Sequence, residues 1–485
     1  MNRFVSALVL LGVITAPRVA AQDLVLTRVH VVDVRTGDVL RDHAIVIADG
    51  VIARVAPMDE LALTNVAPRL VDGRGAYVIP GLLDMHAHVR GNGLPDWITT
   101  DWMMPLLLAH GVTGVRDMGS ACAPTSGGDA CLEKMLAWRQ QVDDGTLLGP
   151  RLLALSTWPL SPPRGPAPPE EQVRTWLRDF HGNGGDLVKI YYRLTPEHLG
   201  WVMDEAATLG LDVAGHIPLR VATAEASAAG LRSIEHARDL LFDGHPGGAA
   251  FRAQARSQNP TLEEMRAMVE QHDPALCDDI FRTLVANDTW YVPTHVTRRM
   301  DAYADDPAFR ADPRSRFLPP MLWDQWNADA DNMVALAPSP EGRRAMRGFY
   351  ERGLEITAAA HLAGVGILLG TDGGDSFVFP GSSAHDELGE LVKAGLSPLD
   401  ALRAATLRGA EFLRLTDRFG TVEPGRAADL VLLEANPLDD IDNVRRIRGV
   451  VFRGEYLDRA RLDAMLEGAE AAAKLPLGQE SGTDS

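Results

Sequence analysis

The chain has 485 residues, a formal net charge of −19, and 46% hydrophobic and 23% charged residues. This length suits one large α/β barrel or two to three domains, and the composition is ordinary for a globular protein with a substantial core. The acidic balance argues against nucleic acid and anionic membranes as partners.

The first 21 residues differ in character from the rest of the chain. Arg3 precedes an apolar run over residues 4–16, and Val19-Ala-Ala21 places small residues just before Gln22. A basic start, a short apolar run and a small-residue exit are typical of a secretory signal peptide, and the run is too short to span a bilayer stably. We therefore predict a periplasmic or secreted protein with no membrane span after residues 1–21 are removed.

Both ends of the remaining chain predict β-structure. Residues 24–33 and 44–55 are apolar runs, and Asp49-Gly50 lies within the second as a hairpin signal. Residues 428–433 and 444–456 have a similar character. We predict a small β-sandwich domain built from residues 22–79 and 416–460, followed by a C-terminal helix and a flexible tail over residues 461–485.

The intervening residues 80–415 alternate strand and helix signals. The eight strand candidates are residues 78–85, 112–117, 151–156, 187–192, 212–216, 233–236, 289–296 and 365–372. Helices are expected between them, with starts at Thr195-Pro196 and Ser397-Pro398. Eight such alternations predict a (β/α)8 TIM barrel of the α/β class. The long connections before the seventh and eighth strands predict helical insertions over the barrel mouth.

Two of the three cysteines flank a short loop rich in Pro, Gly and Ser. In an oxidising compartment, Cys122 and Cys131 favour a disulfide across this loop, with two free thiols as the alternative. Cys277 would remain a free thiol.

Unusual polar residues stand near the carboxyl ends of the predicted barrel strands, where such barrels place their active sites. They are His86, His88, Lys189, His216, His236 and Asp372. His86 and His88 have the i, i+2 spacing that points two side chains to one face of a strand. Each residue alone has an ordinary structural explanation, but these explanations would have to hold at five strand ends together. We predict that the six side chains form a metal site.

The motifs around these residues resemble a known superfamily. Pro80-Gly-Leu-Leu-Asp-Met-His-Ala-His88 and Gly370-Thr-Asp372 are similar to motifs of the amidohydrolase superfamily, in its binuclear metal type with a carboxylated lysine. The segment from Gly420 to Leu433 resembles the return of that family to its β-sandwich. Within the superfamily, Gly111-Val-Thr-Gly-Val-Arg-Asp117 and Leu187-Val-Lys-Ile-Tyr191 resemble the imidazolonepropionase-like and prolidase-like group.

The resemblance implies a role for each ligand. His86, His88 and Asp372 would hold one divalent metal, His216 and His236 a second, and Lys189, converted to N6-carboxylysine by CO2, would bridge both. Zinc fits this set of nitrogen and oxygen ligands, with Mn, Fe and Co as alternatives. A metal-bridging hydroxide would attack the scissile carbonyl, and Asp372 would act as general base and then as general acid.

Three further residues have two explanations each. His295 on the seventh strand could donate a hydrogen bond to the oxyanion or contact substrate, or it could be a buried structural histidine. Tyr191 shares a face with Lys189 and could reach substrate or serve packing. Arg116 could bind a carboxylate, although a salt bridge with a barrel acid is favoured.

Together these features predict a secreted metal-dependent amidohydrolase that cleaves an amide C–N bond in a small molecule, namely a dipeptide or N-acyl amino acid. One alternative is hydrolysis of a cyclic amide, lactone or phosphoester at the same site. Another is a periplasmic metal-binding protein without catalysis. Lys189 argues against a deaminase, because deaminases on this fold usually use one metal and no lysine bridge. The oligomeric state, a homo-oligomer included, stays open.

Overall fold

The computed structural model describes residues 24–61, 68–89, 95–123, 129–161, 167–255, 257 and 259–476. The predicted signal peptide and the end of the predicted tail lie outside these ranges. Within them, no helix combines the length and the apolar character needed to cross a membrane.

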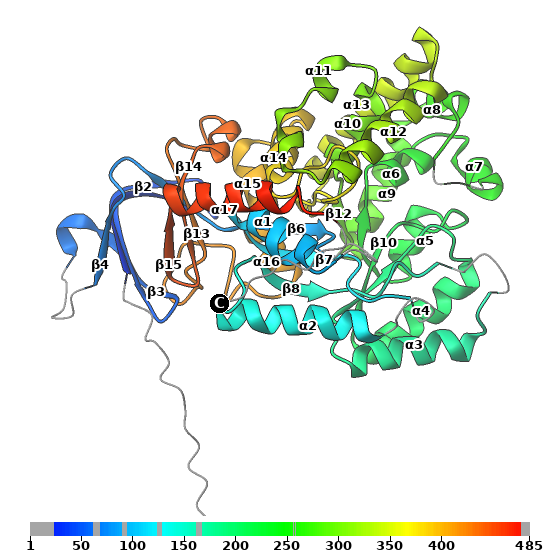
Figure 1. The fold of residues 1–485 in the computed structure, drawn as a ribbon. Coiled ribbons are helices and arrows are strands. Elements are labelled where there is room, and N and C mark those ends of the chain that lie inside the picture. Colours follow the sequence, from blue (N-terminus) through cyan, green and yellow to red (C-terminus); the bar gives the residue numbers. More distant parts are fainter. Residues whose placement is uncertain are drawn as a thin grey trace, which may run out of the picture.

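Strands from the two ends of the chain form one sheet of eight strands. They are β1 (Leu24–Val32), β2 (Val39–Ala48), β3 (Val51–Pro57), β4 (Arg69–Asp72), β5 (Tyr77–Pro80), β13 (Leu430–Leu433), β14 (Ile447–Phe452) and β15 (Glu455–Asp458). The order is β15-β14-β13-β5-β1-β2-β3, and β4 pairs with β1. The N-terminal and C-terminal strands meet where β5 runs antiparallel to β13, at one end of the molecule in Figure 1.

Strand β1 is irregular in its middle, and this irregularity determines how the strands of the β domain pair. Arg28 has a φ of 56°, and the register with β2 shifts between Leu26 and Val29. The first half of β1 therefore pairs with β4 and its second half with β5, so hydrogen bonding continues through all eight strands. One hydrophobic cluster joins β1 and β2 to β13, with Leu26, Ile45 and Leu430 among its buried members.

The middle of the chain contributes seven parallel strands in two groups. The first group is β6 (Leu82–Ala87), β7 (Val112–Asp117) and β8 (Arg151–Leu155). The second group is β9 (Leu187–Ile190), β10 (Asp212–Gly215), β11 (Leu231–Glu235) and β12 (Trp290–Val292). Each of these strands overlaps one of the first seven strand predictions.

The eighth predicted strand is an extended segment held by isolated bridges. Its Ile367 bridges Tyr291 of β12, and Gly373 bridges Ala87 of β6. A further bridge joins Ser156, directly after β8, to Leu187 of β9. The seven strands and residues 365–373 therefore follow one another as neighbours in the predicted order, and the last neighbours the first.

Helices connect these strands and fill the long connections. Those before β12 are η1 (Met58–Glu60), the π-helix η2 (Ile98–Met103), α1 (Met104–Ala109), α2 (Asp129–Asp144), α3 (Glu170–Gly182), α4 (Pro196–Leu209), α5 (Thr223–Ala228), α6 (Arg238–Asp243), α7 (Gly248–Gln254), α8 (Leu262–Glu270) and α9 (Pro274–Ala286). Those after β12 are α10 (His295–Tyr303), α11 (Pro307–Arg310), η4 (Pro313–Phe317), α12 (Pro320–Leu336), α13 (Pro340–Leu362), α14 (Ser382–Ala394), α15 (Pro398–Ala404), α16 (Leu407–Phe412), η5 (Ile441–Arg445) and α17 (Arg459–Ala472).

Local sequence signals explain several helix starts. The hydroxyl of Thr195 accepts a hydrogen bond from the His198 N–H at the start of α4, and Ser397 accepts one from the Asp400 N–H at the start of α15. Helices α11 to α13 occupy the long connection before residues 365–373 and gather at the top of Figure 1.

Cys122 and Cys131 form a disulfide with their Cα atoms 5.5 Å apart, as the sequence predicted. This bond ties the segment that follows β7 to helix α2. Cys277 is a buried free cysteine on α9.

Candidate metal centre

The six predicted ligand side chains meet at the carboxyl ends of the parallel strands. His86 lies near the end of β6 and Lys189 lies within β9, whereas His216 and His236 directly follow β10 and β11. Asp372 follows the segment that takes the place of the eighth strand. Because parallel strands end at one edge, residues distant in sequence converge there.

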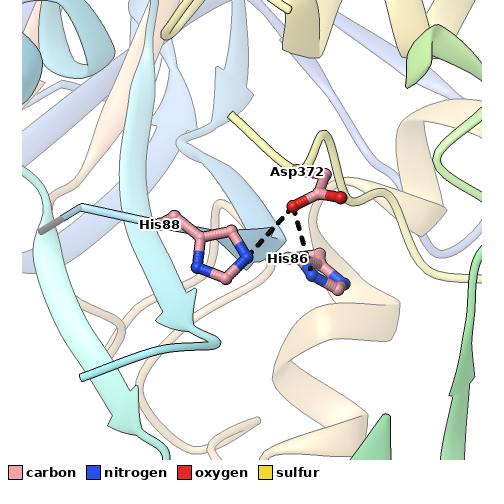
Figure 2. A group of neighbouring side chains, drawn as sticks. All are labelled: His86, His88 and Asp372. Carbon is pink, nitrogen blue, oxygen red and sulfur yellow. Dashed lines mark ion pairs between the residues drawn. The ribbon is translucent and has the colours of Figure 1, made fainter. Parts of the chain in front are cut away.

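His86, His88 and Asp372 form the tightest group, shown in Figure 2. The Nε2 atom of His88 lies 3.0 Å from Oδ1 of Asp372, and Nε2 of His86 lies 3.5 Å from the same oxygen. One possible ligand atom from each residue lies within 4.8 Å of the others. This spacing would let one cation bind all three.

The remaining three residues lie beside this group. Nε2 of His216 and Nε2 of His236 are 3.1 Å apart, and the ring of His236 lies 4.9 Å from the ring of His86. Nζ of Lys189 lies 3.2 Å from Nε2 of His86. The structure thus brings all six predicted residues into one cluster.

Two of the histidine rings have a hydrogen-bond partner at Nδ1 that can stabilise one tautomer. Nδ1 of His86 lies 2.7 Å from Oε2 of Glu235, and Nδ1 of His236 lies 2.8 Å from Oγ1 of Thr294. An imidazole that donates from Nδ1 keeps a free electron pair on Nε2. In both rings that atom is directed into the cluster, as metal ligation requires.

Glu235 is a functional residue that the sequence analysis missed. Its side chain is fully buried and accepts hydrogen bonds from Arg116, 2.8 Å away, and from Ser233. Burial opposes its ionisation, but the Arg116 cation and His86 outweigh this and lower the pKa of Glu235 to about 2. The carboxylate is therefore ionised and can orient His86. The sequence feature that could have revealed Glu235 is an acidic residue within an apolar strand, two residues after Ser233 and next to His236.

Arg116 is accordingly a salt-bridge partner of a barrel acid, which is the explanation that the sequence favoured. Its side chain is fully buried between Glu235, Ser233 and the carbonyl oxygen of Met85. The other explanation, that it binds a substrate carboxylate, is not supported by this position.

A second buried acid, Asp84, ties β6 to the segment that carries Asp372. Its Oδ1 accepts from the backbone N–H groups of His86 and Thr371, and its Oδ2 accepts from the Thr371 hydroxyl at 2.6 Å. The N–H of Asp372 donates to the carbonyl oxygen of His86 at 2.7 Å, and a φ of 62° turns the Asp372 backbone. These bonds hold the two segments that bear the tight group.

Lys189 is 2% exposed, and its burial changes the chemistry of its amine. Burial, with help from the cations Arg116 and Arg238, lowers the pKa of Lys189 to about 8. The neutral amine is therefore more abundant at neutral pH by about two orders of magnitude than in an exposed lysine.

The two remaining predicted residues, Tyr191 and His295, lie in different surroundings from each other. The ring of Tyr191 lies 4.4 Å from the ring of His216 and is partly exposed, so it borders the cluster. His295 is fully buried, and its Nε2 lies 2.9 Å from Oγ1 of Thr357 on α13. Among the described residues, no contact joins the His295 ring to the six-residue cluster.

The structure thus places His295 as a buried histidine hydrogen-bonded to Thr357, and its predicted contact with the oxyanion or the substrate stays a prediction. The sequence placed residues 289–296 on one straight strand, but β12 ends at Val292 and α10 begins at His295. The turn between them directs Thr294 rather than His295 toward the cluster.

Arg238 is a further neighbour that the sequence analysis did not single out. Its side chain is buried on α6, with Nη2 at 3.2 Å from Nδ1 of His216 and Nη1 at 3.4 Å from Oδ1 of Asn259. A buried cation thus stands beside one end of the cluster.

Comparison with known proteins agrees with this geometry. The sequence profile of the amidohydrolase family matches residues 77–457, so the chain belongs to this family. A putative prolidase from Bifidobacterium longum has 25% sequence identity and a TM-score of 0.64, over 93% of this chain and 99% of that one. The bottromycin amidohydrolase structure has 25% identity and a TM-score of 0.71, over 94% and 91%.

Curated relatives are more distant or match only in part. The ochratoxinase of Aspergillus niger is 22% identical over 477 residues, covering 87% of this chain and 84% of the relative. A 5-methylthioadenosine/S-adenosylhomocysteine deaminase from Teredinibacter turnerae is 38% identical over 136 residues. That match spans 24% of this chain and 31% of the deaminase, so this chain matches under a third of the length of that relative.

The pairing of Arg116 with Glu235 gives a stability prediction. Arg116→Met keeps the volume but leaves the buried carboxylate without its cation, so the free energy of unfolding should fall by about 3–5 kcal/mol. Urea unfolding of the metal-free protein measures this. Arg35→Met, which removes a surface pair with Glu423, is the matched control and should change stability by at most about 1 kcal/mol. Equal stabilities for the two variants would contradict the assigned role of Arg116.

Proposed function

We propose that this chain is a secreted, binuclear metal-dependent hydrolase that cleaves the amide C–N bond of dipeptides or N-acyl amino acids. The observation that carries the proposal is the convergence of four histidines, one aspartate and one buried lysine in a chain of the amidohydrolase family. The prolidase and amidohydrolase names of two similar structures support an amide substrate. Secretion is supported by the pattern of residues 1–21 and by the disulfide.

The proposed architecture is a closed (β/α)8 barrel over residues 80–415. Its support is the unbroken order of neighbours from β6 to residues 365–373 and back to β6. The β domain takes residues 22–79 and 416–460. In such a barrel the cluster lies at the catalytic face.

The proposed ligands divide into two sites. His86, His88 and Asp372 would hold one metal, His216 and His236 would hold the other, and carboxylated Lys189 would be a ligand to both. Zinc suits these donors. When bound, the two ions supply an activated water and polarise the scissile carbonyl.

The chain's own residues supply the proton chemistry. Asp372 is 17% exposed, so its carboxylate faces both the cluster and the open side of the site. There it takes a proton from the attacking water and returns it to the leaving nitrogen. Lys189 must lose its proton before it can react with CO2, and its lowered pKa favours that reaction. Glu235 keeps His86 in the tautomer that ligation needs.

Arg238 supports substrates that carry a free carboxylate. A buried guanidinium beside the proposed metal sites can donate charge-assisted hydrogen bonds to an anionic substrate group. Dipeptides and N-acyl amino acids carry such a group next to the scissile bond.

The first test is turnover. Purified, metal-loaded protein is assayed for amine release from a library of dipeptides and N-acyl amino acids, together with lactones, cyclic amides and phosphoesters. Asp372→Asn should lower kcat by about 100- to 10,000-fold, because it removes the proton carrier, while much of the metal stays bound. A wild-type protein that binds metal without turnover would support a metal-binding protein instead, and full activity of the variant would refute the role of Asp372.

The second test concerns the bridging lysine. Lys189→Ala should lose most of the bound metal, measured by elemental analysis, and added formate or acetate should restore part of it by replacing the carbamate oxygens. Lys134→Ala, which removes a surface lysine paired with Asp96, is the control and should bind metal like the wild type. An unchanged metal content in Lys189→Ala would show that the bridge is assigned to the wrong residue.

The third test concerns Arg238. Arg238→Met should raise KM for an N-acyl amino acid by about 10- to 100-fold, the loss expected for one hydrogen bond to a charged group. The matching carboxamide, which has no carboxylate, should be hydrolysed by the variant and the wild type at similar kcat/KM. Equal losses on both substrates would mean that Arg238 supports the site without recognising the carboxylate.

A further inference from the structure

The turn between β12 and α10 contains an unusual backbone conformation. Thr294 has a φ of 45° and a ψ of 50°, and its side chain is fully buried. A β-branched residue in this left-handed region is a genuine outlier, because its side chain crowds the backbone. Glycine would adopt the same conformation without this strain. The presence of threonine therefore calls for a role of its hydroxyl group.

The hydroxyl of Thr294 is directed away from its own helix. Threonine at the residue before a helix usually accepts a hydrogen bond from the first turn, but Thr294 makes no such bond to α10. Its Oγ1 lies instead 2.8 Å from Nδ1 of His236. His236 itself has a φ of 72°, so two strained residues meet in this hydrogen bond.

The carboxyl group of Glu387, a residue distant in sequence, provides the missing cap; its burial raises its pKa to about 8. Glu387 on α14 is fully buried, and its Oε1 and Oε2 accept hydrogen bonds from the N–H groups of His295 and Val296 at 3.0 and 2.9 Å. Thr297 also donates to the carbonyl oxygen of Thr294 from its N–H and its hydroxyl. The start of α10 is thus held from α14, which leaves the Thr294 hydroxyl available to His236.

The consequence falls on one ring atom of His236. The Thr294 hydroxyl can accept the Nδ1 proton, and the tautomer that it stabilises has the electron pair of Nε2 directed toward the cluster, 3.1 Å from Nε2 of His216. His86 obtains the same orientation from a carboxylate, whereas His236 obtains it from a neutral hydroxyl on a strained turn.

We propose that Thr294 is the positioning residue for His236 in the second metal site and that Glu387 acts through it by holding the turn. This inference rests on the proposed assignment of His236 as a metal ligand. It predicts that loss of the hydroxyl weakens the second metal selectively, while His86, His88 and Asp372 continue to bind the first.

The experiment measures zinc binding to the metal-free full chain by calorimetric titration. Thr294→Val keeps the branched shape and the strain but removes the acceptor, so the second Kd should rise by about 10- to 100-fold while the first stays within about 3-fold. Thr294→Ser keeps the hydroxyl and should bind both metals within about 3-fold of the wild type.

A matched control is available on the neighbouring helix. Thr357 is also fully buried, and its hydroxyl bonds to the ring of His295, which is not a proposed ligand. Thr357→Val therefore removes an equivalent hydrogen bond and should leave both zinc affinities unchanged. A loss of affinity in this control as large as in Thr294→Val would overturn the inference in favour of a general packing effect.

The role of Glu387 is tested by a double-mutant cycle. Glu387→Gln should weaken the second metal, because an amide cannot accept from two N–H groups with both of its terminal atoms. The double variant with Thr294→Val should bind the second metal no more weakly than Thr294→Val alone, because both substitutions act through one hydroxyl. Additive losses would overturn the proposed relay, while the comparison of Val with Ser at position 294 still decides the role of Thr294.

The outcomes separate this inference from the proposed function. Two metals bound by the wild type and by Thr294→Val with equal affinities would overturn the inference alone. A wild-type chain that binds only one zinc ion would overturn the binuclear proposal, and the inference with it.

Discussion

The buried ion pair between Glu235 and Arg116 is the interaction on which the six-residue cluster depends. Both side chains are fully buried, so each charge requires the other. The pair also crosses the parallel strands, because Arg116 belongs to β7, Glu235 belongs to β11, and the carboxylate reaches His86 on β6. One carboxylate therefore neutralises a core cation, joins three strands and sets the tautomer of a ligand.

The two halves of the cluster are supported by different chemistry. Around His86, the neighbours are the acids Glu235 and Asp84, which favour positive charge nearby. Around His216 and His236, the hydrogen-bond partners are the cation Arg238 and the hydroxyl of Thr294, which carry no negative charge, and the Asp372 carboxylate lies 3.8 Å from Nδ1 of His236. Since a carboxylate partner raises the basicity of a histidine ligand, the His86 side should hold a cation more firmly than the other side.

The convergence of the six proposed ligand residues could be predicted from the sequence because their placement follows from topology. In a parallel sheet, a polar residue that directly follows an apolar strand lies at the carboxyl edge of the sheet. His216 and His236 are two such residues. Features that depend on one backbone angle could not be predicted. The turn at Thr294 places His295 at the start of α10 rather than on the expected strand, and the irregularity at Arg28 lets the two halves of β1 pair with β4 and β5. The role of Glu235 could not be predicted from the sequence, because it depends on partners from two other strands.

The short junction between β5 and β6 limits how early in synthesis this part of the chain can reach its final structure. Only Gly81 separates the two strands, and a side chain there would collide with Thr113. The strand that carries His86 is thus rigidly continuous with β5, and one edge of β5 is completed by β13, about 350 residues later in the chain. Such distant pairing forms slowly. A ribosome must therefore release nearly the entire polypeptide before β5, which leads directly into the strand that carries His86, acquires its final neighbours.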